Sequence, residues 1–170
     1  MASEGKPKPV DPEFTKKVVD SGADTVTLCF QCGTCTGGCP SGRVTAFRTR
    51  KLMRRVQLGF KDEVLPSDEL WLCTTCTTCD DRCPRGVKIT DVIMTLRNMA
   101  VKEGYMADAH KNTARHLAKS GHAIPLGDAF RQLRETLGLG GEPPTVLSDS
   151  EALEEVKKIV KATKFDELVE

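Results

Sequence analysis

The 170-residue chain is poor in aromatic residues, with one Trp, one Tyr and six Phe, and its formal net charge is only +1. So few rings argue against a platform on which nucleic-acid bases stack. So small a net charge favours neither nucleic acid nor an anionic membrane surface as a partner. We therefore expect no nucleic-acid binding.

Long apolar runs are also missing. No stretch reaches the roughly 18 consecutive apolar residues that indicate a membrane-spanning helix. The N-terminal segment Met1–Pro9 has no apolar core of the kind that a signal peptide contains. We expect a cytoplasmic protein without a membrane span.

Familiar catalytic motifs are absent from the sequence as well. It has no pair of adjacent cysteines, no glycine-rich phosphate-binding loop and no His-Glu-x-x-His run. The three histidines, His110, His116 and His122, are six residues apart, so they do not share one helical face. We predict that this chain has no catalytic residue and no substrate site.

The sequence does contain eight cysteines, in two runs that share the spacing C-x2-C-x2-C-x3-C-P. This spacing is typical of proteins with two [4Fe–4S] clusters, in which the fourth cysteine of a run ligates the other run's cluster. The predicted ligands of the first cluster are Cys29, Cys32, Cys35 and Cys83. The predicted ligands of the second cluster are Cys73, Cys76, Cys79 and Cys39.

This crossed pairing makes the two runs one folding unit, because neither cluster closes without both, and metal binding is then coupled to folding. In the first run, Gly33, Gly37 and Gly38 would let the loop wrap around the metal. The second run has no glycine, and we expect its threonines to donate hydroxyl hydrogen bonds instead.

Two other uses of eight cysteines fit the sequence less well. Structural zinc sites usually pair two C-x2-C knuckles, which leaves the third cysteine of each run and the C-P ending without a purpose. A framework of disulfides is typical of small secreted chains. Iron–sulfur clusters remain the favoured interpretation.

The two runs belong to a longer internal repeat, with an offset of 44 residues between Cys29 and Cys73. Each run leads into a stretch with apolar residues at helical spacing, and neither stretch alternates with a period of two. We therefore predict a mostly α fold in which helices hold the clusters. The expected helices span residues 11–19, 46–60, 67–72, 90–102, 106–119, 126–137 and a segment that begins near 151 after a capping box at 148–151.

We expect three parts along the chain. Residues 1–22 form an arm, 1–10, and a short helix; residues 23–105 form the two-cluster core; and residues 106–170 form a helical extension for packing and for docking a partner. The inward faces are expected to carry Leu52 and Met53 in the first long helix, Ile93 and Leu96 in the second, and Leu153, Val156, Ile159 and Val160 in the last.

Three features near the runs have two interpretations each. Six basic residues form either a docking face or a plain solvated face: Arg43, Arg48, Arg50, Lys51, Arg54 and Arg55. Trp71 and Leu72 either shield a cluster or pack in the core. Asp80 and Asp81 would lower the reduction potential of a nearby cluster unless Arg82 cancels their charge.

The paired runs, the helical spacer with its basic cluster, the chain length and the ending Glu142–Val156 resemble the C subunit of heterodisulfide reductase from methanogens and related anaerobes. The runs alone indicate the wider α-helical ferredoxin class, which includes subunits of fumarate and succinate dehydrogenases and glycolate-oxidase-type proteins. The resemblance covers nearly the whole chain and implies an α-helical ferredoxin with flanking N- and C-terminal helices.

The resemblance also implies a function and partners. A flavin-bearing A subunit would supply electrons, and this chain would relay them through two [4Fe–4S] clusters to a B subunit whose CCG motifs hold the catalytic site for the CoB–CoM heterodisulfide. Larger assemblies would add a hydrogenase or a formate dehydrogenase. No CCG motif occurs here, which fits a non-catalytic relay subunit. The alternative is a relay subunit of another anaerobic oxidoreductase, of the glycolate, glycerol-phosphate or fumarate/succinate type.

Overall fold

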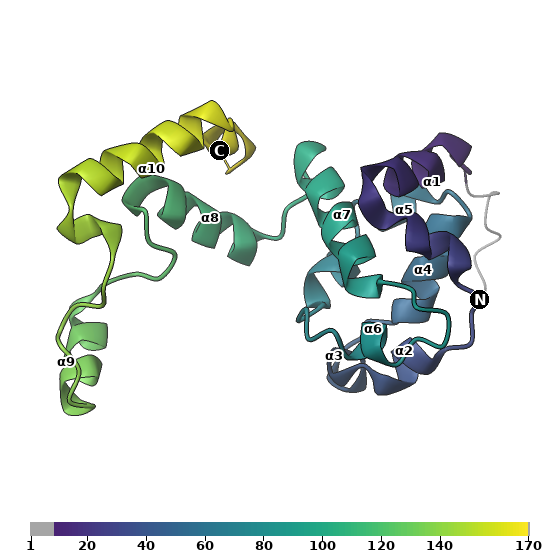
Figure 1. Ribbon diagram of the computed structural model, residues 1–170, viewed down its shortest axis with the longest axis horizontal. Coiled ribbons are helices and arrows are strands. Elements are labelled where there is room, and N and C mark those ends of the chain that lie inside the picture. Colours follow the sequence, from purple (N-terminus) through teal and green to yellow (C-terminus); the bar gives the residue numbers. More distant parts are fainter. Residues whose placement is uncertain (1–8, 170) are drawn as a thin grey trace, which may run out of the picture. The chain divides into compact units, whose positions relative to one another are not determined.

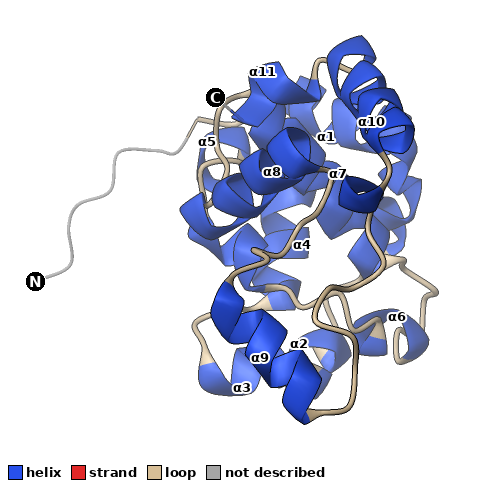
Figure 2. Ribbon diagram, turned by 90° about the vertical axis from the view of Figure 1, so that its left-hand side faces the viewer, coloured by secondary structure: helices blue, strands red, loops and turns tan. Residues whose placement is uncertain are grey.

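The structure is a computed structural model that describes residues 9–169. Within that range the regular elements are helices and no strand occurs, as the ribbon in Figure 2 shows. The predicted mostly α fold is confirmed. In the same range no helix is both long and apolar enough to cross a membrane. Most of the predicted arm, 1–10, lies outside the described residues.

The chain divides into two compact units, Met1–Tyr105 and Met106–Glu170 (Figure 1). The first unit contains α1 (Pro12–Val18), α2 (Thr34–Gly38), α3 (Pro40–Val44), α4 (Thr49–Gln57), α5 (Lys61–Val64), α6 (Thr78–Asp81) and α7 (Ile89–Lys102), with a π-helical turn η1 (Val19–Ala23) and 3-10 turns η2 (Asp24–Leu28) and η3 (Asp68–Leu72). The second contains α8 (Asp108–Ser120), α9 (Asp128–Thr136), η4 (Val146–Ser148), α10 (Ser150–Ala162) and α11 (Phe165–Val169).

Helix α1 begins as its sequence predicts. The Asp11 carboxylate accepts hydrogen bonds from the backbone N–H groups of Glu13 at 3.0 Å and Phe14 at 3.2 Å, and Pro12 occupies the first turn. An N-cap of this kind satisfies N–H groups that have no partner within the helix. Phe14 and Val18 are fully buried, so α1 packs one apolar face against the core of the first unit.

The first long helix is shorter than predicted. Helix α4 covers Thr49–Gln57 and not 46–60, because Arg48 has extended backbone and Gly59 takes a left-handed conformation with φ +73°. Glycine adopts that conformation without the clash that a Cβ causes, and it commonly ends helices. The predicted inward face is confirmed for Leu52 and Met53, which are both fully buried.

Helix α7 supplies the other long apolar face. Its residues at helical spacing are buried with the exception of Met99, which is partly buried against the same core. The buried apolar residues of α7 are Ile89, Val92, Ile93, Leu96 and Ala100. They belong to one cluster with Phe14 and Leu52, so the helices that follow the two cysteine runs share a single core.

The turn η3 leads the chain into the second run. Ser67 caps it, because its hydroxyl accepts a hydrogen bond from the Glu69 N–H at 3.1 Å, as predicted. Trp71 and Leu72 pack against the core cluster and line neither of the cysteine pockets described below. The structure therefore favours the core-packing interpretation for both side chains.

Most side chains of the second unit are exposed or half-buried. Helix α10 begins at Ser150 and its N-cap is Asp149, whose carboxylate accepts from the N–H groups of Glu151 and Ala152; the predicted capping residue Ser148 is therefore wrong. A carboxylate at the N-cap also faces the positive end of the helix dipole. Of the four residues predicted to face inward, Leu153, Val156 and Val160 are half-buried, but Ile159 is 62% exposed.

The position of Gly59 generates a testable prediction. A Cβ at Gly59 would lie 2.8 Å from the carbonyl carbon of Asp11, whose N–H donates to the Gly59 carbonyl at 2.8 Å. Gly22 also has a positive φ, of +96°, but no atom would lie within 4 Å of its Cβ. We expect Gly59→Ala to lower the free energy of unfolding by about 1–3 kcal/mol more than Gly22→Ala, because only the first variant is overpacked. Anaerobic urea denaturation measures both, and equal losses would contradict the packing argument.

Candidate metal centres

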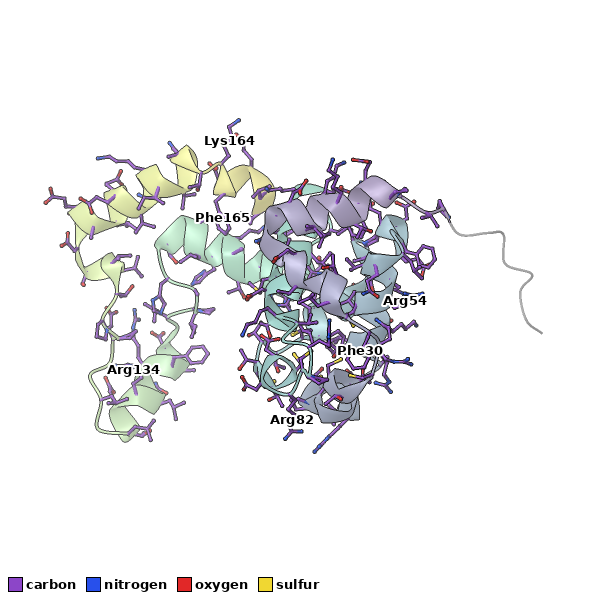
Figure 3. All side chains as sticks on the ribbon, turned by 45° about the vertical axis from the view of Figure 1, so that its right-hand side comes forward. Phe30, Arg54, Arg82, Arg134, Lys164 and Phe165 are labelled. Atoms are coloured by element: carbon purple, nitrogen blue, oxygen red, sulfur yellow. The ribbon has the colours of Figure 1, made fainter. Side chains whose placement is uncertain are left out.

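The eight cysteines surround two separate pockets. The first pocket, of about 330 Å³, is lined by Cys29, Cys32, Cys35 and Cys83. The second, of about 310 Å³, is lined by Cys39, Cys73, Cys76 and Cys79. The fourth cysteine of each run thus lies at the other run's pocket. Figure 3 shows yellow sulfur atoms gathered near the labelled Phe30. Each pocket therefore brings four cysteines together, three from one run and one from the other.

Left-handed residues bend both cysteine loops at matching positions. Gln31 (φ 67°) and Gly33 (φ 87°) flank Cys32, and Thr75 (φ 53°) and Thr77 (φ 59°) hold the corresponding positions 44 residues later. Left-handed backbone costs an L residue with a Cβ about 1–2 kcal/mol. The second loop therefore makes the same bend with two β-branched residues, at a conformational cost.

The glycine prediction for the first loop is only partly right. Gly33 takes the left-handed conformation, but Gly37 and Gly38 lie inside the short right-handed helix α2. Helix α2 packs against α6 of the second run. The loop bends at Gly33, and the other two glycines serve the helix that follows.

Backbone N–H groups point at the sulfur atoms of the two exchanged cysteines. The Gly42 N–H donates to Cys39 Sγ at 3.3 Å, and the Val87 N–H donates to Cys83 Sγ at 3.3 Å. Hydrogen bonds to sulfur are among the features by which a protein tunes an iron–sulfur cluster. Each exchanged cysteine is thus held by the segment that follows its own run.

The second cysteine of each run is exposed and lies beside a hydroxyl group. Cys32 Sγ is 3.4 Å from the Thr34 hydroxyl oxygen, and Cys76 Sγ is 3.5 Å from that of Thr78. These hydrogen bonds lower the pKa of both thiols. Thr78 thus lies where the sequence predicts a threonine beside sulfur, with Thr34 as its counterpart in the first run, but the Cys76 thiol is the donor to Thr78, so hydroxyl donation by this threonine stays a prediction.

Three cysteines deeper in the pockets show the opposite trend. Burial raises the pKa of Cys35 and of Cys73. Burial, followed by the nearby Asp80 carboxylate, raises the pKa of Cys79 to about 12. In the metal-free chain these thiols are protonated at neutral pH. Iron binding must therefore displace protons from them, so cluster binding and proton release are coupled.

A buried arginine that sequence reasoning missed lies next to the second run. Arg97, in α7, is 9% exposed, and its guanidinium donates to the Cys73 carbonyl at 2.6 Å and the Leu70 carbonyl at 2.9 Å. It also lies over the Trp71 ring, 5.4 Å from the centroid. The available signal was its position on the apolar face of the helix, four residues after the buried Ile93.

The other predicted features are placed as follows. Asp80 accepts a hydrogen bond from the Thr90 N–H at 2.9 Å and so joins α6 to the first turn of α7. Arg55 bridges Glu63 at 3.2 Å and Glu69 at 3.3 Å, so this basic residue has a structural role. The remaining basic residues are exposed: Arg43, Arg48, Arg50, Lys51 and Arg54.

The donor set fits a pair of iron–sulfur clusters. Each pocket brings four soft sulfur ligands together, and in both pockets N–H groups point at sulfur. Among residues 9–169, no three His, Cys, Asp or Glu side chains converge closely enough to hold a single metal ion. The cysteines are spread around a hollow instead.

A protein-family model described as a 4Fe–4S dicluster domain matches residues 25–87. This segment contains all eight cysteines and both pockets. The predicted cofactors, two [4Fe–4S] clusters, are confirmed by this match.

Curated relatives match almost the entire chain. The iron–sulfur C subunit of CoB–CoM heterodisulfide reductase from Methanopyrus kandleri is 54% identical, over 94% of this chain and 81% of the relative. The C subunit of the H2:CoB–CoM heterodisulfide,ferredoxin reductase from Methanothermobacter thermautotrophicus is 51% identical, over 94% and 86%. The C subunit of the ferredoxin:CoB–CoM heterodisulfide reductase from Methanosarcina mazei is 46% identical, over 92% and 96%. With its two cysteine-lined pockets, the chain belongs to the family of heterodisulfide reductase C subunits.

Proposed function

We propose that this chain is the electron-relay subunit of a CoB–CoM heterodisulfide reductase. Electrons from a flavin-bearing A subunit would pass through the two [4Fe–4S] clusters to the catalytic B subunit. The observation that carries this proposal is the pair of four-cysteine pockets within one core, in a chain whose relatives are named as C subunits of this enzyme.

We propose crossed ligation of the two clusters. Cys83 would complete the cluster of Cys29, Cys32 and Cys35, and Cys39 would complete that of Cys73, Cys76 and Cys79. The lining of the two pockets supports this assignment, as do the N–H groups that donate to Cys39 and Cys83 from the segments after each run.

In the relay, the protein would hold the two clusters and surround them with apolar side chains. A [4Fe–4S] cluster with four cysteine ligands accepts and gives up single electrons and leaves no iron open to substrate. The chain supplies the thiolates, donates N–H groups to sulfur and packs apolar side chains such as Val87 and Ile93 against the pockets. Cys32 and Cys76 are exposed, so each cluster would have one edge at the surface for exchange with a partner.

The names of the relatives support a complex with other subunits. The relative from Methanothermobacter thermautotrophicus is a subunit of an enzyme named for H2, the heterodisulfide and ferredoxin. A further relative, from Methanococcus maripaludis and 43% identical over 92% of this chain, is a subunit of an enzyme named for H2 and formate together with the heterodisulfide and ferredoxin. We propose A and B subunits as direct partners, with a hydrogenase or formate dehydrogenase in a larger complex. We place the complex in the cytoplasm, because thiols that serve as metal ligands are kept reduced there.

Crossed ligation predicts which cluster each serine substitution damages. Cys83→Ser should perturb the cluster of Cys29, Cys32 and Cys35, because a hydroxyl is a poorer iron ligand than a thiolate. Cys39→Ser, the matched variant, should perturb the cluster of Cys73, Cys76 and Cys79. Iron content and electron paramagnetic resonance spectra of the anaerobically purified chain distinguish the two. Damage confined to the cluster of the substituted run would refute the crossed assignment.

The relay function predicts which proteins copurify with this chain. Anaerobic affinity purification of the tagged chain from its native host should recover a flavoprotein and a subunit with CCG motifs, identified by mass spectrometry. The same purification with the chain lacking residues 106–170 tests whether the second unit contributes to docking. Recovery of a glycolate-, glycerol-phosphate- or succinate-oxidising flavoenzyme in their place would favour the alternative oxidoreductases.

A further inference from the structure

Arg97 is a buried cation that contacts the entrance to the second cysteine run; a further N–H lies 3.9 Å from the Met94 sulfur on its own helix. Two of its N–H groups donate to the carbonyls of Leu70 and Cys73, and its guanidinium lies over Trp71. Only 9% of the residue is exposed to solvent. Solvent therefore screens its charge poorly, and the charge acts on whatever lies beside Cys73.

In the described part of the chain, no carboxylate forms an ion pair with Arg97. This contrasts with Arg55, which is half-buried and bridges both Glu63 and Glu69. A buried charge without a counter-charge costs several kcal/mol, so buried arginines are normally paired. Two carbonyl groups offset part of that cost, but they carry no net charge.

The missing negative charge is available at the second pocket. Cys73 is one of the four cysteines that line it. A [4Fe–4S] cluster with four thiolates carries net negative charge and gains one further negative charge on reduction, and its potential depends on nearby charge and solvent exposure. A poorly screened cation at this place stabilises the reduced form more than the oxidised form.

We infer that Arg97 is the buried counter-charge of the second cluster and raises the reduction potential of that cluster, whereas the first cluster has no such buried cation beside it. This inference rests on the proposed ligation of the second cluster by Cys73. Arg97 ligates nothing and is a positioning residue that also tunes the potential of the site.

The internal repeat makes this effect specific to one cluster. The residue 44 positions before Arg97 is Met53, which is fully buried and uncharged. The arginines that line the first pocket, Arg50 and Arg85, are exposed, so water and salt screen their charges. The two clusters would each have four cysteine ligands, but they differ in the buried charge beside them.

Asp80 exerts an opposing effect on the same cluster. Its carboxylate oxygen lies 3.6 Å from Cys79 Sγ and is held there by the Thr90 N–H. The potential of the second cluster therefore reflects both charges, and each can be removed on its own. Removing the Asp80 charge should shift the potential in the direction opposite to removing the Arg97 charge.

The test compares the full-length chain with Arg97→Met, which keeps an unbranched apolar side chain and removes the charge. Each protein is loaded with clusters anaerobically, its iron is counted, and its potentials are measured by a redox titration followed by electron paramagnetic resonance. We expect one of the two potentials to fall, with about a tenfold weaker preference for the reduced form, which is about 59 mV for one electron. The other potential should stay unchanged.

Two further variants separate charge from packing. Arg97→Lys keeps the charge and should retain most of the wild-type potential, and Asp80→Asn should raise the potential that Arg97→Met lowers. If Arg97→Met does not retain both clusters, Arg97→Gln takes its place, because it removes the charge and keeps a side-chain N–H donor for the two carbonyls. Arg48→Met is the matched surface control, because exposed Arg48 also donates to carbonyls, those of Gly42, Thr45 and Phe47, and its removal should shift neither potential.

Contrary outcomes are distinct for the inference and for the proposed function. Unchanged potentials in Arg97→Met with full iron content, equal shifts of both clusters, or an Arg97→Lys shift as large as that of Arg97→Met would overturn the role of Arg97. A wild-type chain that does not hold two four-iron clusters under the same conditions would overturn the proposed relay itself.

Discussion

The rest of the structure depends on the exchange of Cys39 and Cys83 between the two pockets. Each run brings three cysteines to its own pocket and sends the fourth to the other. That exchange requires the short helices α2 and α6 to lie together, and it fixes where α3 and the segment before α7 must begin. The apolar faces of α4 and α7 then share one core. Metal chemistry and hydrophobic burial thus specify the same arrangement.

The elements predicted well from sequence were those with a strong local cause. The cap at Asp11, the cap at Ser67 and the apolar face of α7 follow from side-chain chemistry and helical spacing. The end of α4 was misplaced because the contact of Gly59 with Asp11 joins distant parts of the chain. The role of Arg97 was missed because a charge count does not reveal burial, which is a property of the folded chain.

The residues that line the two pockets indicate which step of the reaction this chain would perform. Four cysteines line each pocket, and under the proposed crossed ligation they would leave no iron open to a substrate. One ligand of each pocket, Cys32 or Cys76, reaches the surface. A chain built in this way could receive and deliver electrons at two places, and in the proposed relay the bond-breaking chemistry belongs to another subunit.

The left-handed threonines of the second loop bear on how the protein matures. Gly33 makes its part of the bend at little cost and leaves Gln31 as the left-handed residue with a side chain in the first loop, whereas the second loop holds both Thr75 and Thr77 in that conformation. Without a cluster, the second loop has one more left-handed residue with a side chain that can relax than the first loop has. Iron insertion must then hold more left-handed residues with side chains in place in the second loop than in the first.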